Sequence, residues 1–433
     1  ATTFAAHMLL PEKTLVSARQ WDAHDPLNAF REQFKIPKVN NEPILYFTGN
    51  SLGLQPADVE SAIQLELEDW GRYGVEGHFH ARHPWYSYHE RLAPGAASIT
   101  GSRLEEVVLM NQLTSNLHFL LISFYRPKGK RVKVLMEHSP FPSDRYAMAS
   151  HVALHGLDPK ESIVEMQPHE GEHTLRTDDI LGKIHELGDE LALVLFGGVN
   201  YYTGQAFNME AITAKAHEVG AVAGFDLAHA VGNIPLRLHD WEVDFACWCT
   251  YKYLNSGPGS VGGAFVHERH HKTDLPRLAG WWGHDKKTRF QMGPDFHPIP
   301  TAEGWQVSNA PVFNMVIHGI ALAQFVQAGM DRLRTKSLQL TGYMEAIIDE
   351  INDKHLADLR IITPRDPVQR GCQLSIVAPV KGKTIYNRLT ERAVSVDWRE
   401  PSVIRMAPVP MYNSFEDVFR FGQVLKECLG IGS

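Results

Sequence analysis

The middle of the chain alternates short apolar stretches with amphipathic ones, and this alternation constrains the fold more than any other feature of the sequence. Residues 191–196 are apolar throughout, as in a strand buried on both faces, whereas residues 114–125 and 209–219 have the apolar spacing of helices. Strands separated by helices form parallel sheets. We therefore predict an α/β fold with a mostly parallel sheet between helices. Further strands are expected at residues 107–110, 131–136, 221–226, 245–250 and 262–266.

The pattern changes near Pro311. A long helical stretch, residues 312–351, precedes short strand-like segments, and a last helix begins at Ser414. This arrangement predicts a smaller α+β domain. The strand-like segments are residues 359–363, 373–377, 395–398 and 403–406. We place a large domain at residues 76–311 and a small one at 312–433, with residues 1–75 packing on the small domain.

Composition excludes several classes of protein. Of the 433 residues, 44% are hydrophobic and 21% charged, which is typical of a globular chain and not of a disordered one. A net charge of −8 without a long basic block argues against nucleic acid as a partner. The longest apolar runs, residues 117–125 and 191–199, are about half of a membrane-spanning helix. We therefore expect no membrane partner.

Cysteine usage indicates a reducing compartment. The four cysteines form no CxxC pair, and a chain of this length does not need disulfides for stability. Residues 1–20 lack the continuous apolar stretch of a secretory signal. We therefore expect a cytoplasmic protein.

Three familiar motifs occur in the wrong context. Residues 267–271 match the H-E-x-x-H zinc signature, but they follow a glycine-flanked strand and lead into a polar loop. Residues 382–384 end like a phosphate loop, but Val377 stands where the first glycine is required. In residues 256–260, Pro258 lacks an amide that a dinucleotide fingerprint would use. We predict no metal and no nucleotide site from these motifs.

A stronger signal comes from residues at strand ends. Asp226 ends one predicted strand and Lys252 follows the next. In an open α/β sheet the carboxyl ends of the strands border the binding crevice. A lysine in this position can form a Schiff base with a carbonyl ligand.

Pyridoxal phosphate needs such a lysine, an acid for the ring nitrogen, a side chain that covers the ring, and a phosphate site. Asp226 can supply the acid, and Phe141 in the loop 139–144 can cover the ring. Residues 111–114 join a strand to a helix, where free amides and the Thr114 hydroxyl can hold phosphate. Each feature alone is explained as well by a helix cap, a turn acid or a packed aromatic. Together and in this order they indicate pyridoxal phosphate.

Long segments around these residues resemble the kynureninase family of fold type I pyridoxal phosphate enzymes, which are related to aspartate aminotransferase. The resemblance covers nearly the whole chain and implies a seven-stranded, mostly parallel sheet in the large domain, with a smaller α+β C-terminal domain. One departure is Gly197, where family members often have a serine. The matching segments are residues 47–54 (FTGNSLGL), 224–233 (GFDLAHAVGN), 244–249 (DFACWC), 251–255 (YKYLN) and 405–414 (RMAPVPMYNS).

Carried over position by position, the resemblance implies that Lys252 binds the cofactor covalently, that Asp226 pairs with the pyridine nitrogen and that Tyr251 transfers protons. In this family the partner subunit supplies the positions of Trp281 and Asn309, so a homodimer with active sites at the interface is implied. The implied cofactor residues are Leu113, Thr114, Phe141, Pro142, Ser143, Asp144, Gly197, Asp226, His229, Tyr251, Lys252, Trp281 and Asn309.

The resemblance also implies a substrate. Kynureninases hydrolyse the Cβ–Cγ bond of L-kynurenine or 3-hydroxy-L-kynurenine, giving anthranilate or 3-hydroxyanthranilate plus L-alanine, in tryptophan catabolism and NAD biosynthesis. Arg405 matches the arginine for the α-carboxylate, and its forked guanidinium suits bidentate pairing. Ser51, His78 and Asn309 are implied at the aromatic end. Histidine and asparagine there resemble the type that prefers 3-hydroxykynurenine, which we predict as the better substrate.

Three alternative functions stay open at this point. A cysteine desulfurase-like pyridoxal phosphate lyase needs a reactive cysteine, and Cys372 is the positional candidate, although the strand-like residues after it indicate a structural thiol. A zinc peptidase would use the motif that begins at His267. A carrier with a decayed active site is disfavoured because Lys252, Asp226 and Tyr251 are all retained.

Overall fold

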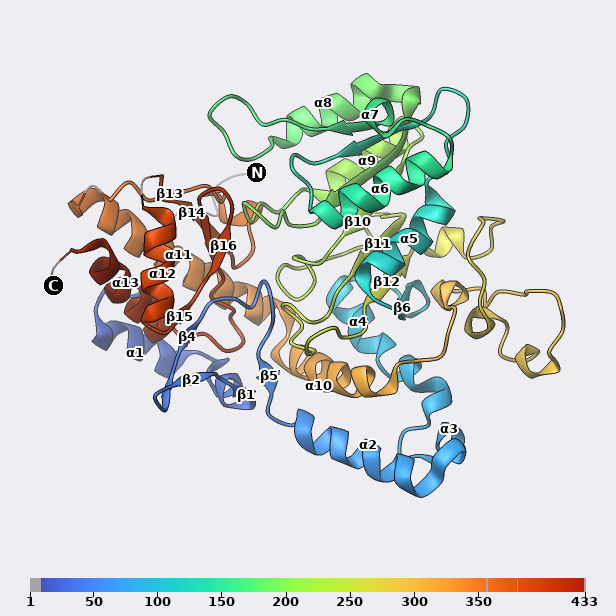
Figure 1. Cartoon of the computed structure of the whole chain (residues 1–433), viewed down its shortest axis with the longest axis horizontal. Helices are drawn as coiled ribbons and strands as arrows, with labels where there is room; N and C mark the ends of the chain where they lie inside the picture. Colours follow the sequence, from blue (N-terminus) through green and yellow to red (C-terminus); the bar gives the residue numbers. More distant parts are fainter. Residues whose placement is uncertain (1–8, 356, 380, 432–433) are drawn as a thin grey trace.

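A seven-stranded sheet lies at the centre of the larger part of the molecule (Figure 1). The structure is a computed structural model that describes residues 9–355, 357–379 and 381–431. The strands of this sheet are β6 (Val107–Leu109), β7 (Lys133–Met136), β8 (Ile163–Glu165), β9 (Leu191–Gly197), β10 (Val222–Asp226), β11 (Phe245–Trp248) and β12 (Gly263–Val266). Their order is β6-β12-β11-β10-β9-β7-β8, and every neighbouring pair is parallel except the two that include β12. The predicted mostly parallel seven-stranded sheet is confirmed.

Both faces of this sheet are covered by helices, because successive residues of its strands point to opposite sides. On β9, Leu193 and Leu195 join a core with α5 and α6, whereas Val194 and Phe196 join a core with α4, α8, α9 and α10. The covering helices are α4 (Ala93–Thr100), α5 (Leu113–Phe124), α6 (Pro142–Leu154), α7 (Pro159–Ser162), α8 (Thr177–Leu187), α9 (Met209–Glu218) and α10 (Val312–Ala328).

A second, four-stranded antiparallel sheet lies in the C-terminal part, in the order β13-β14-β17-β16. Its apolar residues form a core with α11, α12 and α13, and the hydroxyl of Ser414 caps α13 by accepting the Asp417 amide at 3.0 Å. These elements are β13 (Arg360–Ile361), β14 (Leu374–Val377), β16 (Asp397–Arg399), β17 (Val403–Met406), α11 (Met330–His355), α12 (Gly382–Glu391) and α13 (Phe415–Leu429).

The N-terminal residues contact both parts of the molecule. Helix α1 (Leu15–His24) packs on α13, and β4 (Leu45–Tyr46) pairs in parallel with β15 (Val394–Ser395). Helix α2 (Val59–Tyr73) instead packs along α10 of the larger part, and α3 (Gly77–His80) follows it. The remaining short strands are β1 (Phe34–Lys35), β2 (Lys38–Val39), β3 (Glu42–Pro43) and β5 (Gln55–Pro56).

The long helix predicted over residues 312–351 is wrong in one respect, because the structure has two helices there. Gly329 has φ +77°, a conformation that ends a helix, and α10 and α11 meet at 81°. Met315 and Phe325 of α10 belong to the core of the large sheet, whereas Leu340 and Ile348 of α11 belong to that of the small sheet. The division of the chain at residue 311 stays a prediction.

In the described ranges, no single helix has both the length and the apolar composition of a membrane span. The α10–α11 pair passes that test only when it is joined across its bend.

Candidate active site

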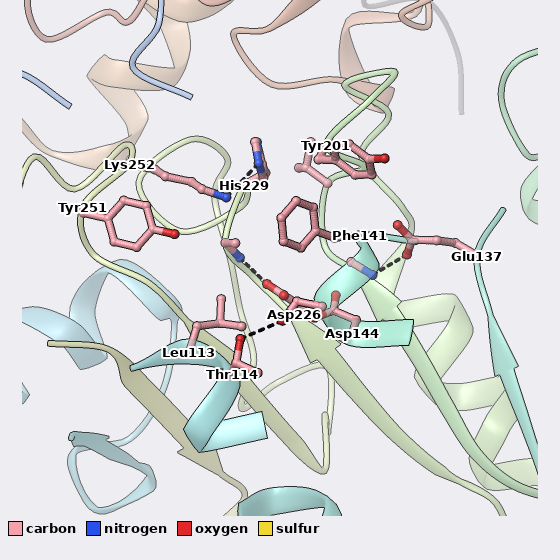
Figure 2. Close-up of a pocket in the computed structure, with 14 residues that line it drawn as sticks. Leu113, Thr114, Glu137, Phe141, Asp144, Tyr201, Asp226, His229, Tyr251 and Lys252 are labelled. Atoms are coloured by element: carbon pink, nitrogen blue, oxygen red, sulfur yellow. Dashed lines mark hydrogen bonds between the residues drawn. The ribbon is translucent and has the colours of Figure 1, made fainter. Parts of the chain in front are cut away.

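A pocket lies at the carboxyl ends of β7, β9 and β10, beside the loop that follows β11 (Figure 2). Of the residues predicted to bind the cofactor, all but Pro142, Trp281 and Asn309 line it. The lining residues are Leu113, Thr114, Glu137, Phe141, Ser143, Asp144, Gly197, Val199, Tyr201, Asp226, Ala228, His229, Tyr251 and Lys252.

Lys252 enters the pocket from the loop after β11. Its Nζ lies 3.0 Å from Nε2 of His229 and 5.7 Å from the centre of the Phe141 ring. Burial lowers the pKa of His229 well below its ordinary value, so its imidazole is neutral and can accept a hydrogen bond from the lysine. Among the described residues, the hydrogen-bond partner of the Lys252 amine is His229, and the amine forms no ion pair with a carboxylate. The amine is therefore available for reaction.

Asp226 and Asp144 form the acidic side of the pocket. Asp226 ends β10 and accepts the Ala228 amide at 2.7 Å, while Asp144 lies in the first turn of α6. Burial, together with the charge of Asp226, raises the pKa of Asp144 well above its ordinary value. Burial also raises the pKa of Asp226, but the Ala228 amide and Lys252 act against this rise. Of the two, Asp144 is therefore the group that more readily keeps a proton, and Asp226 is the one that more readily carries the negative charge.

Two helix starts meet next to these acidic residues. Thr114, in the first turn of α5, is 2.9 Å from Ser143 in the first turn of α6, measured between the hydroxyl oxygens. Gln112 precedes α5 without a capping side-chain hydrogen bond, so the first amides of this helix are not capped by that side chain. Free amides and hydroxyls at helix starts bind phosphate groups.

The pocket therefore fits pyridoxal phosphate on its own chemistry. It joins a reactive amine, a buried carboxylate for a ring nitrogen and a phosphate-binding end. In addition, Nδ1 of His229 and Oδ1 of Asp144 are buried without a hydrogen-bond partner among the described residues. Buried polar atoms of this kind normally have partners, so these two are free to contact a bound ligand.

Arg405 borders the pocket without lining it. This buried side chain belongs to β17 and donates from Nη1 to the carbonyl of Tyr201 at 2.6 Å, and Tyr201 does line the pocket. Its other Nη donates to Asp397. The guanidinium of the small sheet and the amine of the large sheet thus approach the same cavity.

The other predicted residues are not gathered here. Pro142 is the first residue of α6, and the loop of Ser51 is held near Lys252 by the Gly53 amide, which donates to the Tyr251 carbonyl at 2.8 Å. His78 on α3 packs edge-on against Trp85 at 5.5 Å.

Trp281 and Asn309 lie in the long segment between β12 and α10, which extends away from the sheet (Figure 1). Trp281 is 44% exposed and donates to the Arg289 carbonyl at 3.0 Å. Asn309 is exposed and lines a small neighbouring cavity together with Asn111. Neither residue lines the pocket of its own chain.

Sequence reasoning missed four lining residues, Glu137, Val199, Tyr201 and Ala228. Glu137 directly follows β7, so the rule that pointed to Asp226 at the end of β10 also applied to it. Val199 and Tyr201 lie in an irregular loop after β9 that carries no recognisable motif.

The structure does not support Cys372 as a reactive cysteine or the motif at His267 as a zinc site. Cys372 is fully buried, and burial raises the pKa of its thiol to about 12, which is the opposite of a reactive cysteine. The H-E-x-x-H residues do not lie on an α-helix: His267 precedes a short 3₁₀ turn and accepts the Arg269 amide at 3.3 Å, while His271 bonds the Val266 carbonyl. A zinc site of this type needs both imidazoles to converge on one ion, but among the described residues the cluster of possible ligands that includes His267 contains Glu106 and His239 and not His271.

Solved structures establish the class of protein. The chain superposes on the cysteine desulfurase CsdA of Escherichia coli with a TM-score of 0.76 and 15% identity, covering 94% of this chain and 99% of that one. A mutant of C-DES with glycine covalently linked to its pyridoxal phosphate gives a TM-score of 0.75 and 17% identity, covering 93% and 99%. At such identities the likeness shows the fold, which is that of the fold type I pyridoxal phosphate enzymes.

Relatives found by sequence comparison identify the family within this fold. A kynureninase of Flavobacterium johnsoniae is 51% identical over 96% of this chain and 98% of its own. One of Myxococcus xanthus is 53% identical over 94% and 96%. Residues 333–425 match the family model of the kynureninase C-terminal domain. The chain belongs to the kynureninase family, so it is a pyridoxal phosphate-dependent hydrolase of carbon–carbon bonds in ketonic substances.

Proposed function

We propose that this enzyme hydrolyses the Cβ–Cγ bond of kynurenines, prefers 3-hydroxy-L-kynurenine, and releases 3-hydroxyanthranilate and L-alanine. The observation that carries the proposal is that the Lys252 amine and the buried Asp226 carboxylate line one pocket, and that the Arg405 guanidinium borders it through its hydrogen bond to the Tyr201 carbonyl. This set provides a covalent anchor, a partner for the ring nitrogen and a carboxylate receptor.

When bound, pyridoxal phosphate supplies an electron sink for the substrate α-carbon. Leu113, Thr114 and Ser143 would hold its phosphate, and Asp226 would keep a proton on its ring nitrogen. Lys252, once released from the cofactor, is placed to take the α-proton and pass it on, with His229 as its neutral hydrogen-bond partner.

Tyr251 is the proposed proton donor for hydration of the side-chain ketone and for the Cβ atom that the cleavage exposes. It precedes Lys252 in the chain and lines the same pocket. Burial raises the pKa of its phenol, so the phenol stays protonated at neutral pH and can donate.

Arg405 is the proposed receptor for the α-carboxylate. It already pairs with Asp397, so a substrate carboxylate must join or displace this ion pair. Burial lowers the pKa of Arg405, but the guanidinium stays charged in proteins, and a buried cation favours an anionic ligand.

A homodimer would bring Trp281, Asn309 and His78 to the pocket of a second chain. Its support is a set of aromatic side chains on the segments that carry these residues. Phe79, next to His78, stacks on Tyr86 at 5.7 Å, and Phe290 stacks on Tyr86 at 5.9 Å and contacts Trp281 at 5.4 Å. Phe79 and Phe290 are 55% and 58% exposed, which is unusual for such side chains unless another surface covers them.

The experiment is a comparison of kcat/KM for the two substrates, with alanine and the aromatic acid measured as products. We expect both to be cleaved, with an advantage of about tenfold or more for the 3-hydroxy compound, because a hydrogen bond to its phenol that contributes about 1.4 kcal/mol changes kcat/KM tenfold. An advantage for unsubstituted kynurenine would refute the preference, and release of sulfur from cysteine without release of anthranilate would refute the function.

We also place the enzyme in the cytoplasm, in keeping with its four unpaired buried cysteines. Its proposed reaction belongs to tryptophan catabolism and NAD biosynthesis.

A further inference from the structure

Glu137 lines the pocket, yet the proposed chemistry gives it no task. Its side chain is 3% exposed and lies directly after β7. One carboxylate oxygen accepts the Gly197 amide, and the other accepts Nδ2 of Asn200 at 3.1 Å. The loop after β9 therefore holds both oxygens of this side chain in place.

Asn200 is itself fixed in orientation. Its Oδ1 accepts the amides of Tyr202 and Thr203 at 3.0 and 2.9 Å, so its Nδ2 must face Glu137. Asn200 thus connects the loop that carries Tyr201 to the Glu137 carboxyl group. The same loop contacts Arg405, which donates to the Tyr201 carbonyl.

The surroundings of Glu137 contain two more buried carboxyl groups. Asp226 comes from β10 and Asp144 from α6, and Figure 2 shows all three on the same side of the pocket as Phe141. The other titratable or charged groups on this pocket are Lys252, His229, Tyr201 and Tyr251, with His138 next to Glu137 in the chain. The lining of this pocket thus contains three carboxyl groups and one lysine.

The ionisation of Glu137 depends on its burial and on the neighbouring charge of Asp226. Burial raises the pKa of Glu137 to about 7, although the Gly197 amide and Asn200 oppose the rise; the charge of Asp226 adds to it. Glu137 therefore gains its negative charge in the neutral range, beside an aspartate that is already charged.

We propose that Glu137 is a positioning residue of the cofactor site, which holds the end of β9 and, through its charge, strengthens the retention of protons on the bound cofactor. The inference rests on the proposed function. A negative charge in a buried site favours a proton on a neighbouring nitrogen atom, and at an effective dielectric constant of about 20 the effect reaches on the order of one pH unit.

Gly197 supports this role. A Cβ atom at this position would lie 3.2 Å from a Glu137 oxygen and 3.3 Å from the Val199 carbonyl. A serine would thus bring a hydroxyl within reach of the carboxylate as a third donor, and donors favour the ionised form of an acid. With glycine, the carboxyl group has two donors among the residues that the structure describes.

The test is a pH titration of the visible absorbance of the bound cofactor in holoenzyme variants. We expect Glu137→Gln to lower the titration midpoint by on the order of one pH unit, and Gly197→Ser to raise it by a smaller amount. The matched control is Glu165→Gln, because Glu165 ends β8, pairs in register with Met136, and bonds Arg145 outside the pocket. We expect the control to titrate like the wild type.

The outcomes separate this inference from the proposed function. Borohydride reduction and peptide mapping first establish whether Lys252 of the wild type carries the cofactor, and failure there overturns the function. If wild type and Glu137→Gln both carry it and titrate alike, this inference is wrong. If Glu137→Gln does not retain cofactor, the Gly197→Ser shift decides: an upward shift supports the role, and no shift or a downward one overturns it.

Discussion

The cofactor side and the proposed substrate side of the active site are built in different ways. Lys252, Asp226 and Thr114 come from strand ends and a helix start around one sheet, and a single chain brings them together. Trp281 and Asn309, by contrast, come from the long segment between β12 and α10 and line no part of this pocket, although Asn309 lines a small cavity beside the end of β6. The difference teaches that one sheet by itself positions the cofactor residues that line the pocket, whereas Trp281 and Asn309 are proposed to serve the pocket of a second copy of the chain.

The largest effect is expected on the cofactor side. Lys252→Ala removes both the covalent anchor and the proposed base, and should lower kcat by about 10⁴-fold or more. Steady-state assays with saturating pyridoxal phosphate check this. His229→Asn, which keeps a polar partner near the lysine, is expected to lose less; equal losses would assign the decisive role to the hydrogen bond instead of the amine.

Substitution of Arg405 tests the proposed carboxylate site between the large and the small sheet. Arg405→Lys keeps the charge but loses the fork, and should lower kcat/KM about 10- to 100-fold, because hydrogen bonds between charged groups contribute about 1.5–3 kcal/mol. The control is Arg399→Lys, since Arg399 also pairs with Asp397, at 3.2 Å, but is more exposed. A loss of similar size in both variants would place the carboxylate site elsewhere.

Co-expression of Lys252→Ala and Trp281→Ala, each expected to be inactive alone, tests the dimer directly. In a dimer of Lys252→Ala with Trp281→Ala, one of the two sites holds an intact lysine and an intact tryptophan if Trp281 acts on the partner's site. Random assortment should therefore restore about one quarter of wild-type activity after co-expression. If no activity returns while mixed dimers form, Trp281 serves its own chain and the contrast between the two sides fails.

His78 tests substrate choice. His78→Ala should reduce the advantage of 3-hydroxykynurenine by about tenfold, because the phenol loses a hydrogen-bond partner. His80→Ala on the same helix is the control, since its side chain is 66% exposed. The ratio of kcat/KM values for the two substrates gives the answer, and an unchanged ratio in both variants would remove His78 from the substrate site.

The smallest effect is expected on the stability of the fold, for a substitution of Glu303, which anchors the segment that carries Trp281. Glu303 binds His89 at 3.2 Å and Lys286 at 2.7 Å, and although burial opposes them these contacts lower the pKa of Glu303 to about 2. A depressed pKa stabilises the fold above the unfolded value of about 4.3, and this contribution is lost as the pH falls toward 2.

Glu303→Gln should therefore cost about 1 kcal/mol at pH 7 and progressively less below pH 5. Denaturant unfolding at both pH values measures the difference. Glu90→Gln removes the other carboxylate on Lys286, which is more exposed, and should cost less. A cost that does not change with pH would show that the carboxylate charge is not what anchors the segment.

Much of the cofactor side could be predicted from the sequence, because it follows from local rules. The apolar run at 191–196 fixed a buried strand, and the acid and lysine that follow predicted strands lie where parallel strands end. Glu137 also directly follows a predicted strand, and it was missed because it has no motif of its own and lies outside the segments that carry the family resemblance. The break at Gly329 was missed because apolar spacing continues through it and only its backbone conformation ends the helix.

The substrate side could not be predicted in this way. Its residues come from segments far apart in sequence, and no periodicity links Ser51, His78 and Asn309. Only the family resemblance suggested them, and within one chain nothing forces them together.

The most direct test of the central claim, that one chain holds the cofactor on Lys252, is borohydride reduction of the holoenzyme followed by peptide mapping. The account predicts a single pyridoxyl adduct, on Lys252, that is absent from Lys252→Ala. An adduct on another lysine, or none at all in an enzyme that still cleaves kynurenine, would contradict it.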